Sequence, residues 1–334
     1  MSQTVDPIPP PPAPAEPAEP SARRRRGLVA VAIGVAVAVL AGVAVFALTR
    51  SDSAEAQPIA LVFEQGQSQT YEIAQSMDAE VASDVFGSRS ISMELTQVVG
   101  WEVTSVDGDG VATIEVTVSE MSGSVNGQPI PETDAHSVPP VEIEIAPDGR
   151  VVSAGGLALG GAGLTQGFGF PGMGQLTPIL PDEGEAVSVG DTWEKEFSQD
   201  FPFGTGTIEF SATSTYERDE EVSGRTAAVI VTELRVPLDF TLSFADLIQA
   251  IDPALTGATD VADLDALSDA SIDYGGEGAF TQTSFVDLEA KELLRMQSDG
   301  TFDIAMEFSG IPGVESSGTV DFTGSFTQDL QLRN

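Results

Sequence analysis

The chain has 334 residues, of which 41% are hydrophobic and 20% are charged, a composition typical of a globular protein with one or two domains. Its 52 acidic residues outnumber its 14 lysines and arginines, giving a net charge of −38 that repels nucleic acids and anionic headgroups. There is no cysteine, which excludes disulfides, thiolate metal sites, a cysteine nucleophile and a lipidated N-terminal cysteine. We therefore expect no nucleic-acid partner and interpret the acidic surface as a solvated one.

The N-terminal part of the chain predicts a cytoplasmic tail followed by a membrane anchor. Residues 1–22 contain eight prolines and few apolar side chains, which indicates a Pro-rich disordered tail. Four arginines follow at 23–26, and residues 27–48 are then uncharged and mostly apolar. At about 1.5 Å per residue this run spans about 33 Å, enough for a hydrocarbon core of about 30 Å. Because the arginines precede the run, residues 23–50 predict a single-pass plasma-membrane helix with the N-terminus cytoplasmic.

Two export signals compete with a retained anchor. Ala54-Glu55-Ala56 has the small-x-small form of a signal-peptidase site, and Arg25-Arg26 begins a loose twin-arginine pattern. The apolar run is longer than the about 7 to 15 residues of a signal-peptide core, so we favour the anchor over secretion after cleavage near Ala56. In both alternatives the chain after the apolar run is exported. We interpret its residues 51–66 as a tether and residues 67–334 as an extracytoplasmic domain.

Alternating apolar and polar residues dominate the exported part and predict strands with one buried and one solvated face. The apolar positions form runs within residues 71–77, 91–103, 112–118, 141–145, 208–216, 228–236, 302–308 and 320–332. Glycine-containing turns at 106–110, 147–150, 222–225, 297–300 and 309–313 favour hairpins. We therefore predict a mainly β fold of about ten strands, arranged as a curved antiparallel sheet or half-barrel.

One or two short helices are expected to interrupt the strands. Phe244, Leu247 and Ile251 recur at helical spacing, and a second apolar stripe runs along residues 260–270. An apolar helix stripe must be covered, so we expect these helices against the concave face of the sheet.

The two halves of the domain echo one another. Residues 95–121 and residues 209–236 each read as a long strand, an acidic glycine turn and a long strand. Each half is therefore expected to add a similar hairpin set to one sheet. Two separate small sandwiches fit the same pattern.

A glycine-rich segment separates the halves. Residues 155–174 contain nine glycines and belong to an uncharged run. Residues 167–172 match the dinucleotide fingerprint G-x-G-x-x-G, but Pro171 and later prolines prevent the helix that the fingerprint must begin. We predict a connection that either covers the concave mouth of the sheet as a lid or plugs its edge. The candidate ligand-binding residues are Leu164, Phe168, Phe170 and Met173 of this segment, together with Phe244, Leu247 and Ile251.

Residue types that carry catalytic and metal chemistry are scarce or poorly placed. The only histidine, His136, lies in a predicted loop, and no serine occupies a G-x-S-x-G motif. Asp107, Asp109 and the aspartates of residues 260–269 lack the spacing of a calcium loop. Composition does not exclude a two-carboxylate glycosidase, but no pair stands out. We therefore expect no catalytic residue, no metal and no cofactor, and interpret the protein as a non-enzyme.

The motif Val189-Gly190-Asp191-Thr192-Trp193 resembles a recurring element of exported, mostly uncharacterised β-rich proteins of actinobacteria. The resemblance covers residues 67–330, and only this motif is sharp. Such domains are similar in outline to the bacterial lipoprotein-carrier and envelope-lipid-carrier superfamily, in which a curved antiparallel sheet wraps helices around an apolar cavity. The resemblance implies a lipid or lipoprotein ligand, although the helical anchor departs from those carriers and argues against long-range shuttling. Physically, Gly190-Asp191 is expected to form a turn that leads Trp193 into the core.

These features predict a membrane-anchored extracytoplasmic protein that binds an apolar envelope ligand, such as a lipid or an acyl chain. The alternative is a non-enzymatic cell-envelope interaction or scaffold protein whose core is filled by its own side chains. A cavity of about 300 to 1,000 Å³ would favour the first.

Overall fold

The computed structural model describes residues 56–83, 87–130, 140–155, 177–200, 207–243, 270–310 and 318–333. Residues from Ala54 onward form one compact unit. The predicted tail and anchor lie outside the described residues, and the two predicted helices fall almost entirely outside them. No helix in the described ranges is long and apolar enough to cross a bilayer.

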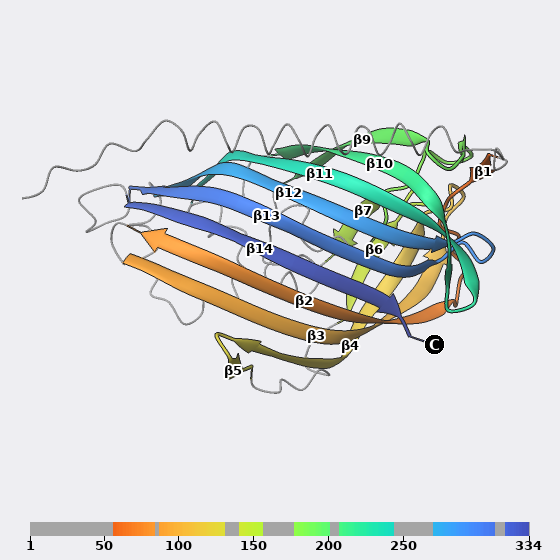
Figure 1. Cartoon of the computed structure of the whole chain (residues 1–334), viewed down its shortest axis with the longest axis horizontal. Helices are drawn as coiled ribbons and strands as arrows, with labels where there is room; N and C mark the ends of the chain where they lie inside the picture. The colour runs from red at the N-terminus through yellow and green to blue at the C-terminus, as the bar shows by residue number, and fades with distance from the viewer. Residues whose placement is uncertain are drawn as a thin grey trace, which may run out of the picture. The chain divides into compact units, whose positions relative to one another are not determined.

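Strands make up most of the described chain (Figure 1). β1 (Gln57–Pro58) and β8 (Ala186–Val187) pair only with each other. The other twelve strands form one sheet in which neighbouring strands are antiparallel, so the predicted mainly β, antiparallel fold is confirmed. They are β2 (Ser68–Ser83), β3 (Gly87–Val106), β4 (Ala112–Val125), β5 (Gln128–Pro129), β6 (Val141–Ile145), β7 (Val151–Gly155), β9 (Thr192–Asp200), β10 (Thr207–Val222), β11 (Arg225–Ser243), β12 (Ser271–Asp287), β13 (Leu293–Ser309) and β14 (Gly318–Leu332).

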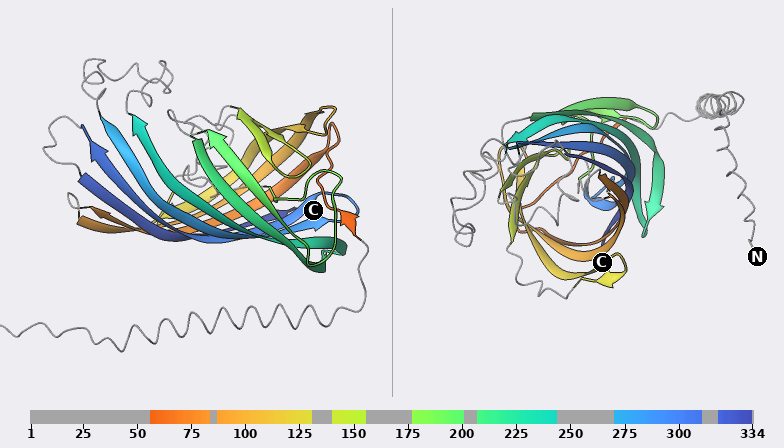
Figure 2. Two further views of the ribbon diagram at one scale, coloured as in Figure 1. Left: turned by 90° about the horizontal axis from the view of Figure 1, so that it is seen from above. Right: turned by 90° about the vertical axis from the view of Figure 1, so that its left-hand side faces the viewer.

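The sheet consists of two meanders joined through the first and last long strands. β2, β3, β4, β6 and β7 lie side by side in chain order, and so do β9 to β14. β14 then pairs with β2, from Val320 opposite Ser83 to Leu332 opposite Tyr71. In the described chain the outermost strands, β7 and β9, do not pair with each other, so the sheet is curved but open (Figure 2). Both halves share this sheet, and the alternative of two separate sandwiches is wrong.

Most of the predicted turns and hairpins are present. Residues 95–121 fall on the β3–β4 hairpin and residues 209–236 on the β10–β11 hairpin. Ser223 and Gly224, which join β10 to β11, have φ of 52° and 80°, as a two-residue hairpin turn with a right-handed twist requires. The turn predicted at residues 297–300 is wrong, because these residues lie inside β13.

β12 is 17 residues long but is not among the predicted strands. Its alternate positions 276, 278, 282 and 284, which share one face, are Gly, Gly, Gln and Ser, so the apolar alternation that marks the other strands is interrupted. β12 is a strand because it pairs with β11 on one side and with β13 on the other, although its own sequence does not predict a strand.

Two coil segments fill one end of the concave face, which we call the packed end. Residues 59–63 contribute Ile59 and Leu61, which are only 2% and 4% exposed, and residues 177–181 contribute Leu180, which is fully buried. The Leu61 N–H donates to the carbonyl of Pro147 (2.8 Å), and the Leu180 N–H donates to the carbonyl of Asp148 (3.0 Å). The folded unit therefore includes residues that the sequence assigns to the tether.

The V-G-D-x-W motif forms a turn that begins β9, as expected. Gly190 has a φ of 95°, which few other residues adopt. The Asp191 carboxylate accepts the Ser188 N–H at 2.7 Å, and its carbonyl accepts the Tyr216 N–H at 3.0 Å. Trp193 then packs, partly buried, against the core of the packed end. The role of the motif is structural.

We predict that Leu61→Ala lowers the free energy of unfolding by about 2 to 5 kcal/mol, because it removes a buried side chain and leaves a cavity. The adjacent Val62 is 50% exposed, and Val62→Ala is expected to change that free energy by less than about 0.5 kcal/mol. Urea unfolding of both variants measures the difference. Equal, small effects would mean that residues 59–63 are a tether after all.

Candidate functional site

The candidate ligand-binding residues predicted from the sequence all lie outside the described residues. Leu164, Phe168, Phe170 and Met173 belong to residues 156–176, and Phe244, Leu247 and Ile251 belong to residues 244–269. Their role as a lid or a pocket stays a prediction. The site is therefore built from the side chains that the described strands present to the concave face.

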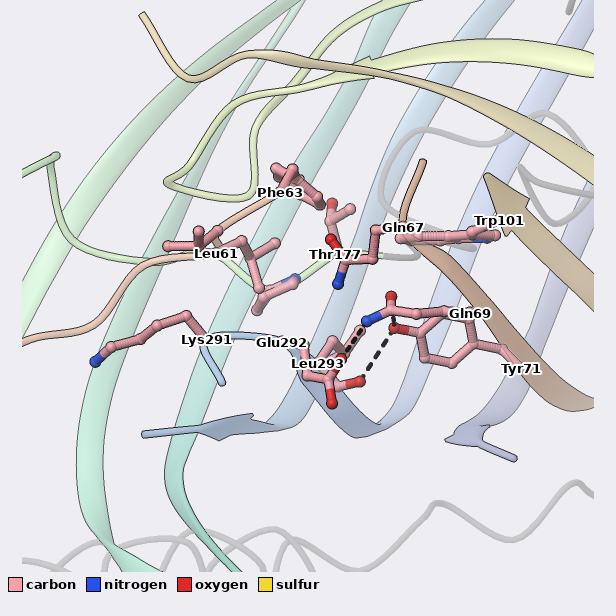
Figure 3. A pocket seen from close by; sticks show the side chains of 12 residues that line it. Leu61, Phe63, Gln67, Gln69, Tyr71, Trp101, Thr177, Lys291, Glu292 and Leu293 are labelled. Carbon is pink, nitrogen blue, oxygen red and sulfur yellow. Dashed lines mark hydrogen bonds between the residues drawn. The ribbon is translucent and has the colours of Figure 1, made fainter. Parts of the chain in front are cut away.

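The packed end is filled. A pocket there lies between residues 61–63, the start of β2 and the turn before β13 (Figure 3). Leu61, Phe63, Tyr71 and Trp101 line it, and its volume is about 10 Å³. This is room for about one water molecule and far less than an acyl chain needs. This pocket is therefore not the site of an acyl chain.

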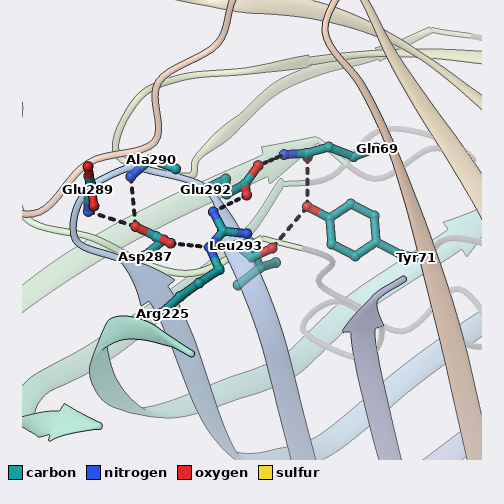
Figure 4. Close-up of polar contacts among 8 residues, drawn as sticks. All are labelled: Gln69, Tyr71, Arg225, Asp287, Glu289, Ala290, Glu292 and Leu293. Carbon is teal, nitrogen blue, oxygen red and sulfur yellow. Dashed lines mark hydrogen bonds and ion pairs between the residues drawn. The ribbon is translucent and has the colours of Figure 1, made fainter. Parts of the chain in front are cut away.

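A network of polar side chains closes the packed end (Figure 4). Arg225, at the start of β11, pairs with Asp287 at the end of β12 and with Glu292 before β13. Glu292 also accepts a hydrogen bond from the Gln69 amide. The Tyr71 hydroxyl lies 2.8 Å from Gln69 Oε1, an acceptor. We call these five residues the end clamp, since they join strands from both meanders.

Burial and hydrogen bonding act in opposite directions on Asp287. Burial by itself would raise the pKa of its carboxyl. The backbone N–H groups of Ala290 and Glu289 and the Arg225 guanidinium outweigh that effect and hold the pKa of Asp287 below its usual value. Burial also raises the pKa of the Tyr71 hydroxyl well above its usual value, so Tyr71 stays neutral and donates. The ion pairs and hydrogen bonds of the clamp thus join β2, β11 and β12 at the packed end.

Because the folded-state pKa of Asp287 is lowered, its stabilising effect is complete above the ordinary aspartate pKa of about 3.9 and is lost as the pH falls through the folded pKa. We predict that Asp287→Asn lowers the free energy of unfolding by about 1.5 to 3 kcal/mol at pH 7 and by clearly less near pH 3. Urea unfolding at both pH values measures this, with Asp299→Asn on the exposed face of β13 as control. The same cost at both values would show that the charge of Asp287 does not matter.

Aromatic rings line the concave face beyond the packed end. We call Phe280, Phe302, Phe322 and Phe326 the aromatic floor; they come from β12, β13 and β14. The centroids of Phe280 and Phe326 lie 5.2 Å apart at 61°, and those of Phe302 and Phe322 lie 4.9 Å apart at 20°. Such edge-on and stacked pairs stabilise beyond the area they bury.

Glycines opposite these phenylalanines let the rings lie against the sheet. Gly300 stands between Phe280 and Phe326 in register, and a Cβ there would lie 2.2 Å from Cδ1 of Phe280. A Cβ on Gly324 would lie 2.6 Å from Cζ of Phe302. The rings therefore lie directly on the glycine backbone, in the space that a side chain would otherwise occupy.

We predict that Gly300→Ala destabilises the protein by about 1 to 3 kcal/mol, because the added methyl group displaces two rings of the aromatic floor. Gly275→Ala on β12 is the control, since a Cβ at Gly275 has nothing within 4 Å. Thermal unfolding of both variants gives the comparison. If Gly300→Ala were as stable as Gly275→Ala, the rings would not lie against Gly300.

A line of polar residues crosses the concave face between two apolar clusters. Ile73, Met296 and Leu330 belong to the cluster of the packed end, and Met77 and Phe326 to the cluster of the aromatic floor. The residues between them stand directly opposite one another on successive strands, and we call them the polar row. The polar row is Gln75, Gln328, Ser298, Gln282, Thr232 and Ser214, on β2, β14, β13, β12, β11 and β10.

Members of the polar row bond to one another and to the coil that crosses the concave face. Gln75 Nε2 donates to Gln328 Oε1 at 3.1 Å, and the Ser214 and Thr232 hydroxyls are 2.8 Å apart. Gln282 Nε2 donates to the carbonyl of Thr177 at 3.1 Å. These bonds offset the cost of burying polar groups.

Gln97 on β3 lies beside the row and is not satisfied. Gln97 pairs with Ile73 on β2, so it is offset from the row by one position on the same face. It is 1% exposed, and neither its Nε2 nor its Oε1 has a hydrogen-bond partner in the described chain. Trp193 Nε1, opposite Ser214 at the other end of the row, is also buried without a partner there. Such groups are rare in native proteins.

The polar row and Gln97 were not predicted as site residues. In the sequence most of them are polar residues at apolar positions of alternating runs, whereas Ser298 falls in the predicted turn at 297–300 and Gln282 in a strand that was not predicted. The available signal was spacing alone: Gln282 and Ser284 lie at alternate positions between the apolar Phe280 and Val286 of β12. Their alignment across strands depends on register, which a single sequence does not show.

Comparisons with known proteins identify no family. No protein-family model matches the chain, and no curated protein matches it. Among solved structures, DynF from the dynemicin biosynthesis pathway of Micromonospora chersina is 8% identical with a TM-score of 0.20; the match covers 84% of this chain and 87% of that one.

Two further solved structures match at similarly low identity. A putative outer membrane lipoprotein-sorting protein domain from Vibrio parahaemolyticus is 10% identical with a TM-score of 0.16, covering 79% of this chain and 86% of that one. A LolA superfamily protein from Nitrosomonas europaea is 10% identical with a TM-score of 0.13, covering 82% and 89%. These TM-scores are too low to carry an argument about fold or function.

Proposed function

We propose that the protein is a non-enzymatic binding protein for an apolar envelope ligand, a lipid or an acyl chain, which it holds on the concave face of its sheet. Residues 27–48 anchor it in the plasma membrane as a single pass, with the N-terminus cytoplasmic and the β domain outside. The anchor and its orientation rest on the sequence, from the length of the apolar run and the arginines before it.

The observation that carries this proposal is the apolar concave face beyond the packed end. The aromatic floor continues toward the end of the sheet at which Ser83, Ser243 and Ser309 end their strands, which we call the remote end. Half-buried apolar side chains lie along this path: Ile91 on β3, Met306 and Phe308 on β13, and Val320 on β14. Covering such side chains is favourable by about 25 cal/mol per Å² of apolar area. An apolar ligand is a chemically suitable cover.

One observation favours the alternative, a scaffold protein with a filled core. The pocket at the packed end has a volume of about 10 Å³, so the side chains that line it nearly fill it. The two functions therefore differ in what occupies the concave face between the aromatic floor and the remote end. Ligand binding there is the property to test.

We predict that the β domain carries an apolar ligand from the cell. The full chain is expressed with a protease site inserted after Arg50, purified, and cut so that the folded domain is released from the predicted anchor. Native mass spectrometry is expected to show about one bound apolar molecule per domain, extractable into organic solvent. An unliganded mass, together with no uptake of a fluorescent acyl ester, would contradict the proposal and favour the scaffold.

A pair of variants tests where the ligand lies. Met306 faces the concave side and is half-buried, whereas its neighbour Ala305 is exposed on the opposite face. Met306→Glu is expected to weaken uptake at least tenfold, because it places a charge against an apolar ligand. Ala305→Glu is expected to leave uptake unchanged. Equal uptake by both variants would exclude the concave face as the site.

A further inference from the structure

We propose that Gln97, together with the polar row, is a recognition site for an uncharged hydrogen-bonding group of the ligand: an ester, an amide or a hydroxyl. This inference rests on the proposed function, since it concerns the chemistry of the ligand that the concave face binds. It assigns the deepest contact of that ligand to a residue of β3.

The state of the Gln97 side chain is the starting point. A carboxamide has two N–H donors and two acceptor lone pairs, and burial removes the water that would otherwise satisfy them. In the described chain, none of these is used at Gln97, although Gln75 and Gln282 of the polar row both have partners. A buried amide without a partner destabilises the empty protein. A ligand with one acceptor or one donor at this point would relieve that cost.

The surroundings of Gln97 select for an uncharged group. Its neighbours on the concave face are Ile73 on β2 and Met121 on β4, and the polar row beside it consists of amides and hydroxyls. A carboxylate or phosphate placed there would lose its water without gaining a counter-charge.

Lys195, on the edge strand β9, shares the inward face of Ala212 and is already paired. Its Nζ lies 3.2 Å from Asp148 Oδ2 and also contacts Asp182. It is therefore not available to neutralise an anionic headgroup, and the preference for an uncharged ligand group holds across the row.

The placement of Gln97 also orients the ligand. Gln97 and Ile91 are six steps apart along β3, which is about 20 Å at about 3.4 Å per residue. The aromatic floor lies on the same face along this direction, on the side of the polar row away from the packed end. The polar group of the ligand meets Gln97, and its apolar chain extends past the floor, where Phe280, Phe302 and Phe326 are already buried, to the half-buried side chains of the remote end.

Three probes of equal chain length separate the contribution of the polar group from that of the apolar chain. They are hexadecane, methyl palmitate and palmitate. Each competes with a fluorescent acyl ester for the released domain, stripped of its native ligand. The variant Gln97→Met keeps the length of the side chain and removes its polar atoms, and Gln331→Leu, at an exposed position on β14, is the control. The thermal unfolding of each unliganded variant is measured in parallel.

Wild-type protein and Gln331→Leu are expected to bind methyl palmitate about tenfold more tightly than hexadecane, the effect of about one hydrogen bond, and more tightly than palmitate. In Gln97→Met the advantage of the ester over hexadecane is expected to disappear, while hexadecane binding is unchanged. The unliganded Gln97→Met domain is expected to unfold at a higher temperature than wild type, because an unpaired buried amide is gone. A merely structural role for Gln97 would not produce this combination.

Other results overturn the inference and separate it from the proposed function. If wild type binds all three probes equally, or Gln97→Met keeps the preference for the ester, Gln97 does not recognise the ligand, but apolar binding stands. If Gln97→Met weakens all probes equally or unfolds at a lower temperature, Gln97 is structural. If palmitate binds most tightly, the ligand group is anionic and the site is wrongly assigned. If no probe binds wild type, the proposed function itself fails.

Discussion

The pairing of β14 with β2 is the constraint on which the rest of this structure depends. It joins the last long strand of the second meander to the first long strand of the first, and so turns two meanders into one continuous sheet. The same pairing leaves β7 and β9 as the two edges, with the glycine-rich segment and residues 177–191 connecting them. At the packed end these edges approach one another, where Lys195 on β9 pairs with Asp148 in the turn between β6 and β7. The concave interior is a consequence of this arrangement.

Register then decides the chemistry of that interior. A shift of one residue in any pair of strands would turn the concave side chains to the outer face. The polar row exists only because Gln75, Gln328 and Gln282 stand in line through three successive pairings. The aromatic floor depends on the same register, since each glycine must meet a ring of the neighbouring strand. One set of pairings thus produces an apolar surface and a polar line that borders it.

The two ends of the sheet have different roles. At the packed end, charged and amide side chains of the end clamp and two buried coil segments leave a pocket of about 10 Å³. Toward the remote end, the inward side chains of Ile91, Met306, Phe308 and Val320 are apolar and half-buried. The packed end is filled, and the surface toward the remote end is apolar. This arrangement suits the proposed binding of a long apolar ligand. The unpaired amide of Gln97 lies where these two regions meet, which is why we assign it to the ligand and not to the fold.

The sequence by itself determined the elements that depend on local physics. Period-two alternation predicted most strands and their buried faces, and positive-φ turns such as Ser223-Gly224 predicted hairpins, because both follow from side-chain direction and backbone sterics. The turn of Gly190-Asp191 and the inward Trp193 were predicted in the same way. The predicted site residues in the glycine-rich segment and in residues 244–269 lie outside the described chain, so that part of the site stays a prediction.

Only the tertiary structure decided which residues share a place on the concave face. Gln75 and Gln328 bond to each other although they are 253 residues apart in the chain. β12, with Gly and Gln at inward positions, is held as a strand by pairing with its two neighbours. Ile59 and Leu61 are buried because they pack against strands far along the chain. The physical reason is that long-range strand pairing is cooperative: register and burial belong to the whole sheet, and no single segment encodes them.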